Sequence, residues 1–148
     1  MRKILTALLP LLLAGCINDT ATYYADSTQE HTLSVRRQQD YFWSDDARIT
    51  LMAARLPDCQ RQLQLTELPI LDTEVELFGS GERHWSLRAG KQVWQVETES
   101  CALQEGGEAS GQKLGVFRGD ADKLVFEPAP APKAAVPADA PAVAETTE

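Results

Sequence analysis

Three cysteines and two histidines are the residues of this 148-residue chain whose side chains could carry the widest range of chemistry. A thiol can be acylated, oxidised to a disulfide or used as a metal ligand. Cys16, Cys59 and Cys101 lie far apart and form no Cys-x-x-Cys pair, so neither a zinc site nor a dithiol redox site is indicated. His31 and His84 stand outside the common metal-ligand patterns. We therefore predict no metal centre and no bound cofactor.

The first cysteine closes a short apolar run. Two basic residues at positions 2–3 precede the mostly apolar segment 4–13 (ILTALLPLLL). This pattern is typical of a secretory signal, and the run is shorter than the roughly 20 apolar residues that a membrane-spanning helix needs. The run ends in Leu-Ala-Gly-Cys at Cys16. That ending resembles the lipobox of bacterial lipoproteins, and the alternative is an ordinary secretory signal followed by an unmodified cysteine.

The resemblance covers residues 1–16 and has consequences for Cys16. It implies that residues 1–15 are a signal peptide and that Cys16 becomes the first mature residue, with lipid on its sulfur and an acylated amino group. Two or three acyl chains exceed the two signals that stable anchoring requires, so we expect a membrane-anchored protein that does not span the bilayer. An Asp after the lipidated cysteine favours the inner membrane in such proteins. Because Ile17 stands there, we expect the periplasmic face of the outer membrane.

The assignment of Cys16 to lipid leaves Cys59 and Cys101 as an even pair. An oxidising periplasm favours a disulfide between them. Closing a loop of about 42 residues should stabilise the domain by about 4 kcal/mol on the chain-entropy model. The alternative is two separate buried thiols.

The sequence contains no pattern that indicates an enzyme. Gly-x-Ser-x-Gly and a Gly-rich phosphate loop are both missing. The carboxylate pairs at 45–46 and at 97 and 99 could serve acid–base chemistry, but such neighbours arise readily in a chain with 22 acidic residues. We predict a non-enzymatic binding, assembly or structural role in the cell envelope.

One glycine-containing segment suggests a different function. Residues 78–84 (FGSGERH) resemble the S-G-x-[RK]-Y loop of periplasmic and membrane-bound lysozyme inhibitors, which are small β-barrel proteins. The resemblance implies that Ser80 and Arg83, with Lys91 nearby, would meet the carboxylates of lysozyme. The aromatic residue after the basic one is displaced to Trp85, because His84 occupies its place. The alternative is a glycine bend between two strands.

Charge and aromatic content narrow the classes of partner. The formal charge is −8, and loss of Arg2 and Lys3 with the signal peptide would make it two units more negative. Phosphates would be repelled, so we expect no nucleic-acid partner; the partners we expect are the membrane, envelope proteins or peptidoglycan. Trp43, Trp85 and Trp94 could form a flat ligand-binding face, although core filling is the commoner use of tryptophan in a small domain.

The remaining elements should position these residues in one all-β domain. We expect a polar tether over residues 16–31, a β-rich domain over 32–127, and a disordered Pro/Ala-rich tail over 128–148. Alternating apolar residues predict short strands, including one that contains Tyr41 and Trp43, and hairpins over 85–96 and 113–126. Residues 47–56 fit both helical and strand spacing, and we choose a strand. The sequence thus predicts a small antiparallel β-sandwich or barrel with one disulfide.

Overall fold

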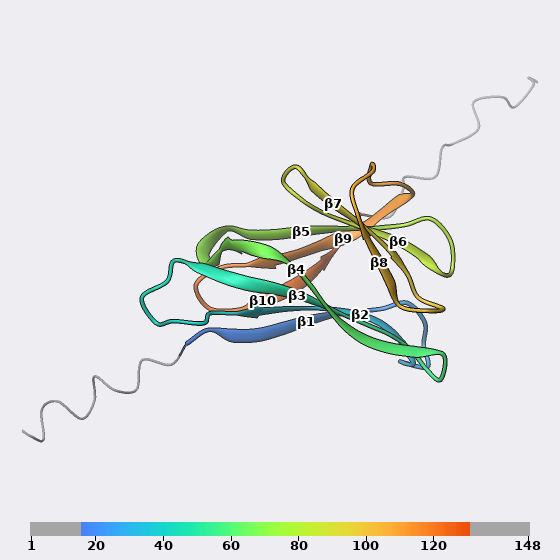
Figure 1. Cartoon of the computed structure of the whole chain (residues 1–148), viewed down its shortest axis with the longest axis horizontal. Coiled ribbons are helices and arrows are strands. Elements are labelled where there is room, and N and C mark those ends of the chain that lie inside the picture. Colours follow the sequence, from blue (N-terminus) through green and yellow to red (C-terminus); the bar gives the residue numbers. More distant parts are fainter. Residues whose placement is uncertain (1–15, 131–148) are drawn as a thin grey trace, which may run out of the picture.

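Two antiparallel β-sheets face each other in the computed structural model, which describes residues 16–130 (Figure 1). The four-stranded sheet has the order β1-β2-β3-β4, and the six-stranded sheet has the order β10-β9-β5-β6-β7-β8. The predicted all-β class is confirmed. The signal peptide at 1–15 and most of the expected tail, residues 131–148, lie outside the described residues.

The strands of the first sheet are β1 (Asn18–Tyr24), β2 (His31–Gln38), β3 (Asp46–Arg55) and β4 (Cys59–Pro69). Those of the second are β5 (Thr73–Gly79), β6 (His84–Ala89), β7 (Gln92–Glu97), β8 (Ala102–Glu105), β9 (Gln112–Gly119) and β10 (Leu124–Pro128), and a 3-10 turn, η2 (Ile70–Asp72), joins β4 to β5.

One hydrophobic core lies between the sheets and explains the alternation in the sequence. In β3, Ile49, Leu51 and Ala53 are fully buried, which confirms the choice of a strand over residues 47–56. Val75 and Leu77 of β5 bury the same alternating face from the opposite sheet. Since successive side chains of a strand point to opposite faces, this period of two places each apolar set in the core.

Both predicted hairpins are present. Strands β6 and β7 pair from His84↔Glu97 to Ala89↔Gln92, and Gly90 in their turn has a φ of +58°, which glycine adopts without steric cost. Strands β9 and β10 pair over Gly115–Gly119 and Leu124–Pro128, so the domain extends one residue past its expected end.

The predicted disulfide between Cys59 and Cys101 is confirmed, with a Cα–Cα distance of 5.9 Å. Cys59 begins β4 of the first sheet, and Cys101 directly precedes β8 of the second. The covalent link therefore joins the two sheets across the core.

The segment that we expected to be a tether differs in the structure. Residues 18–24 form β1, which pairs along its whole length with β2. Only Ala21 of β1 is buried, because the strand lies at the sheet edge. An edge strand of this kind shows no apolar alternation, which is why the sequence pattern indicated a polar linker. The folded domain thus begins immediately after Ile17.

The expected strand through Tyr41 and Trp43 is also absent. Residues 39–45 form the loop between β2 and β3, with a turn hydrogen bond from Ser44 N to Tyr41 O of 2.9 Å. Tyr41, Phe42 and Trp43 are all exposed. Strand β2 ends at Gln38, and a hydrogen bond from Gln39 Nε2 to Ser44 O of 2.7 Å closes the segment as a loop, so alternation over these few residues does not produce a strand.

A buried arginine joins the two sheets at this end of the domain. Arg37 of β2 has a fully buried side chain and pairs with Asp19 of β1 through Nη2–Oδ2 and Nε–Oδ1 contacts of 2.7 and 3.1 Å. Its Nη1 donates to the carbonyl oxygens of Ile70 and Asp120, at 2.6 and 2.7 Å. Asp19 also accepts a hydrogen bond from Leu124 N at 2.8 Å. One guanidinium therefore fixes the start of β1 against η2 and the β9–β10 turn.

Candidate functional site

Cys16 lies at the very edge of the folded domain. Its side chain is exposed, and its thiol is outside the disulfide formed by the other two cysteines. Ile17, the next residue, exchanges two hydrogen bonds with Gln39: Gln39 N donates to Ile17 O at 2.8 Å, and Ile17 N donates to Gln39 Oε1 at 3.2 Å. Cys16 is thus held within one residue of the β2–β3 loop. Its lipidation remains a prediction.

The aromatic residues of the β2–β3 loop form a cluster beside this position. The rings of Tyr41 and Trp43 stack with centroids 5.1 Å apart, and the Phe42 ring meets Trp43 edge-on at 4.7 Å. We call Tyr41, Phe42 and Trp43 the aromatic loop. A cleft of about 460 Å³ next to it is lined by Ile17, Gln39, Phe42, Trp43, Ser44, Asp45, Pro69, Ile70 and Leu71.

The three tryptophans do not form a common face. Trp85 and Trp94 are 5% and 1% exposed and belong to the core, whereas Trp43 is 68% exposed. The expectation of core filling holds for two of the three. The sequence feature that could have indicated the exposure of Trp43 is its position in a run of three aromatic residues directly before Ser44.

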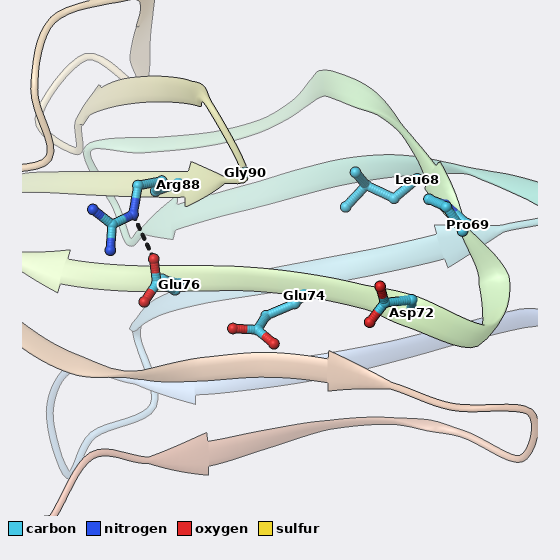
Figure 2. A pocket seen from close by; sticks show the side chains of 7 residues that line it. All are labelled: Leu68, Pro69, Asp72, Glu74, Glu76, Arg88 and Gly90. Atoms are coloured by element: carbon cyan, nitrogen blue, oxygen red, sulfur yellow. Dashed lines mark hydrogen bonds and ion pairs between the residues drawn. The ribbon is translucent and has the colours of Figure 1, made fainter.

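A second cleft, of about 510 Å³, lies along β5 and is lined by several acidic residues (Figure 2). Glu76 receives a hydrogen bond from Arg88 Nε at 2.5 Å and another from Lys113 Nζ at 2.6 Å. The bond from Arg88, and then that from Lys113, lower the pKa of Glu76 below its usual value. Such a carboxylate is ionised at neutral pH and is a poor proton donor. Glu74 is paired with Arg118 at 3.3 Å. The lining residues are Leu68, Pro69, Asp72, Glu74, Glu76, Arg88 and Gly90.

The carboxylates at positions 97 and 99 have structural partners. Glu97 accepts hydrogen bonds from Ser100 N at 3.0 Å, from Ser100 Oγ at 2.7 Å and from Glu99 N at 2.5 Å. The two backbone bonds are the main cause of the lowering of its pKa to about 2. Glu99 pairs with Arg83 at 2.5 Å. Glu97 thus stabilises the turn before Cys101 as an anion.

The histidines lie in different environments. His31 is buried against Trp85, with ring centroids 5.4 Å apart, and its Nε2 is 3.1 Å from Thr98 Oγ1. Burial, and secondly the charge of Arg55, lower the pKa of His31. His84 is exposed at the start of β6. Within residues 16–130, no three His, Cys, Asp or Glu side chains come close enough together to hold a metal ion.

Of the residues suggested by the lysozyme-inhibitor resemblance, Ser80 and Arg83 share one loop, and Lys91 lies apart from them. Ser80 and Arg83 lie in the loop before β6, whereas Lys91 lies in the turn after it. The six residues of β6 separate them by about 20 Å at the rise of an extended strand. Arg83 is moreover paired with Glu99. Their role as a partner-binding loop remains a prediction, but a single basic patch is not formed.

Comparison with known proteins gives no match at the level of family models, curated sequences or solved structures. Among the described residues there is also no helix of the length and hydrophobicity needed to cross a bilayer.

Proposed function

We propose that this chain is a bacterial envelope lipoprotein, anchored through Cys16 to the periplasmic face of the outer membrane, with a non-enzymatic binding, assembly or structural role. The observation that carries the proposal is the Leu-Ala-Gly-Cys ending of the apolar run in residues 1–16. Acylation needs an accessible thiol, and the exposed position of Cys16 is compatible with it. The use of the other two cysteines in a disulfide agrees with an oxidising compartment.

Mass spectrometry of the N-terminal peptide from bacterial membranes tests the proposal. We expect a mature chain that begins at Cys16 and carries acyl groups, and a Cys16→Ser variant without them. The Cys59→Ser/Cys101→Ser variant is the matched control, because it removes the two disulfide-bonded cysteines and should remain acylated. An intact leader on the mature protein, or membrane partition and acylation that survive Cys16→Ser, would refute the anchor.

A further inference from the structure

Most of the exposed large hydrophobic side chains of residues 16–130 gather at one end of the domain. Six such side chains are exposed in this part of the chain: Tyr24, Tyr41, Phe42, Trp43, Leu56 and Leu71. The three of the aromatic loop are 58%, 70% and 68% exposed, and Leu71 of η2 is 73% exposed. Trp43 and Leu71 line the same cleft. These four residues form an apolar end surface, and such a concentration on a small protein indicates an interaction site.

The loop that presents these rings has a defined conformation. Gln39 Nε2 donates to Ser44 O at 2.7 Å, which closes the loop across its base. Ile70 N donates to Asp45 O at 2.9 Å and ties the loop to η2, and Arg48 forms an ion pair with Asp40. The backbone therefore holds the three rings in positions where most of each side chain stays exposed.

The apolar end surface is next to the point where the lipid would be attached. Figure 1 shows the start of β1 and the β2–β3 loop at the same end of the two sheets. Ile17 exchanges two hydrogen bonds with Gln39 of the loop, and Cys16, which would carry the lipid, is the residue directly before Ile17. No linker of several residues is available to lift the domain away. A lipid on Cys16 must therefore bring the aromatic loop to the membrane surface.

The chemistry of the surface selects the lipid interface over other occupants. Tryptophan and tyrosine prefer the boundary between headgroups and acyl chains, where an apolar ring and a polar N–H or O–H are both accommodated. Asp45 lines the same cleft as Phe42 and Trp43, Asp46 follows it in the chain, and Asp72 follows Leu71, so the charged residues next to the surface in sequence are carboxylates. They would be repelled by anionic headgroups, so the surface suits zwitterionic lipids.

We propose that the apolar end surface is a second membrane contact, in which Trp43 and Phe42 insert beside the acylated Cys16 and hold the domain in a fixed orientation on a zwitterionic leaflet. This inference rests on the proposed anchoring of Cys16. The acyl chains supply the affinity, and the aromatic loop supplies the orientation, because one flexible attachment point cannot prevent a domain from tilting.

Quenching of Trp43 by brominated lipid tests the contact. The full-length acylated protein is bound to phosphatidylcholine vesicles with or without bromine on the acyl chains, and a Trp43→Phe variant gives the emission of the buried Trp85 and Trp94 for subtraction. We expect bromine to lower the Trp43 emission by about two-fold or more, since an interfacial side chain reaches the acyl boundary.

A matched control places the tryptophan at the other end. The Trp43→Phe/Tyr24→Trp variant keeps three tryptophans but moves the exposed one to the far end of β1, where Tyr24 is 54% exposed. We expect no quenching of this variant.

Each adverse result has a distinct meaning. If Cys16 is acylated on the vesicles but bromine leaves Trp43 unquenched, the membrane contact is wrong and the anchor stands. Equal quenching of the control variant would show an unoriented domain and would also overturn the contact. A concentration-dependent blue shift of Trp43 emission without bromine quenching would instead identify a second copy as the occupant. If mass spectrometry of the same sample finds Cys16 unmodified, both the anchor and the contact fail.

Discussion

Replacement of Arg37 by methionine should strongly destabilise the domain. Arg37 is fully buried and donates two hydrogen bonds to Asp19 and two to backbone carbonyl groups. Removing one partner of a buried ion pair costs about 3–5 kcal/mol, because the other charge is left uncompensated. Asp19 keeps 23% of its side chain exposed, which favours the lower part of that range. The two carbonyl groups that lose a donor add to the cost.

We therefore expect Arg37→Met to lower the free energy of unfolding by about 3–4 kcal/mol. At about 4 °C per kcal/mol for a domain of this size, the Tm should fall by about 12–16 °C. Urea unfolding followed by tryptophan fluorescence measures the change, because Trp85 and Trp94 are buried in the core. The same detergent and buffer are used for every variant.

Arg118→Met is the matched control. Arg118 is 51% exposed and pairs with Glu74 and Glu127 at 3.3 and 3.6 Å. Exposed pairs of this kind contribute about 1 kcal/mol or less, so the control should lose little stability. The Asp19→Asn/Arg37→Met variant should lose less than the sum of the two single changes, because no unpaired charge remains. A loss below about 1 kcal/mol for Arg37→Met, or full additivity in the double variant, would refute the assigned role of the pair.

Three further perturbations test other parts of the domain. Glu97→Gln should reduce the loss of stability on acidification, and urea midpoints measured between pH 2 and pH 5 test this. The pKa of Glu97 in the folded protein is about 2, below the usual 4.5, so the stability that the anion contributes is complete above pH 4.5 and disappears as the pH falls through 2. Cys59→Ala/Cys101→Ala should lower the free energy of unfolding by about 4 kcal/mol in urea titrations, and an unchanged midpoint would argue against the cross-link's role. Gly119→Ala should cost about 1–3 kcal/mol by calorimetry, because its new methyl carbon would lie 2.5 Å from Arg37 Nη1; wild-type stability would show that the guanidinium can move aside.

Local patterns predicted most of the strands correctly. Strands β3, β5, β6, β7 and β9 each bury one alternating face, and a period of two is visible wherever a strand has one face in a core. The disulfide followed from the number of cysteines and the compartment that the lipobox implies. The first inference uses alternation among neighbouring residues, and the second uses only the types and number of residues in the chain.

The errors occurred where the surroundings, and not the local pattern, decide the structure. Strand β1 is stabilised by pairing with β2 and by side-chain contacts such as Thr22 Oγ1 to Ser34 Oγ at 2.8 Å, so it needs no apolar face. Tyr41 and Trp43 looked like alternating strand residues, but they belong to a loop that presents them to solvent. Lys91 is close to Arg83 in sequence and lies at the opposite end of β6.

The sequence by itself determined the β class, the pairing of two cysteines and the expectation of a lipid on the third. Only the tertiary structure decided that Arg37 is buried, because its partners lie 18, 33 and 83 residues away along the chain. It also decided that the aromatic loop lies beside Ile17, since that contact depends on a register between β1 and β2. Alternation and residue type are local properties, whereas the neighbours of a charge or an aromatic ring are set by how distant strands pair.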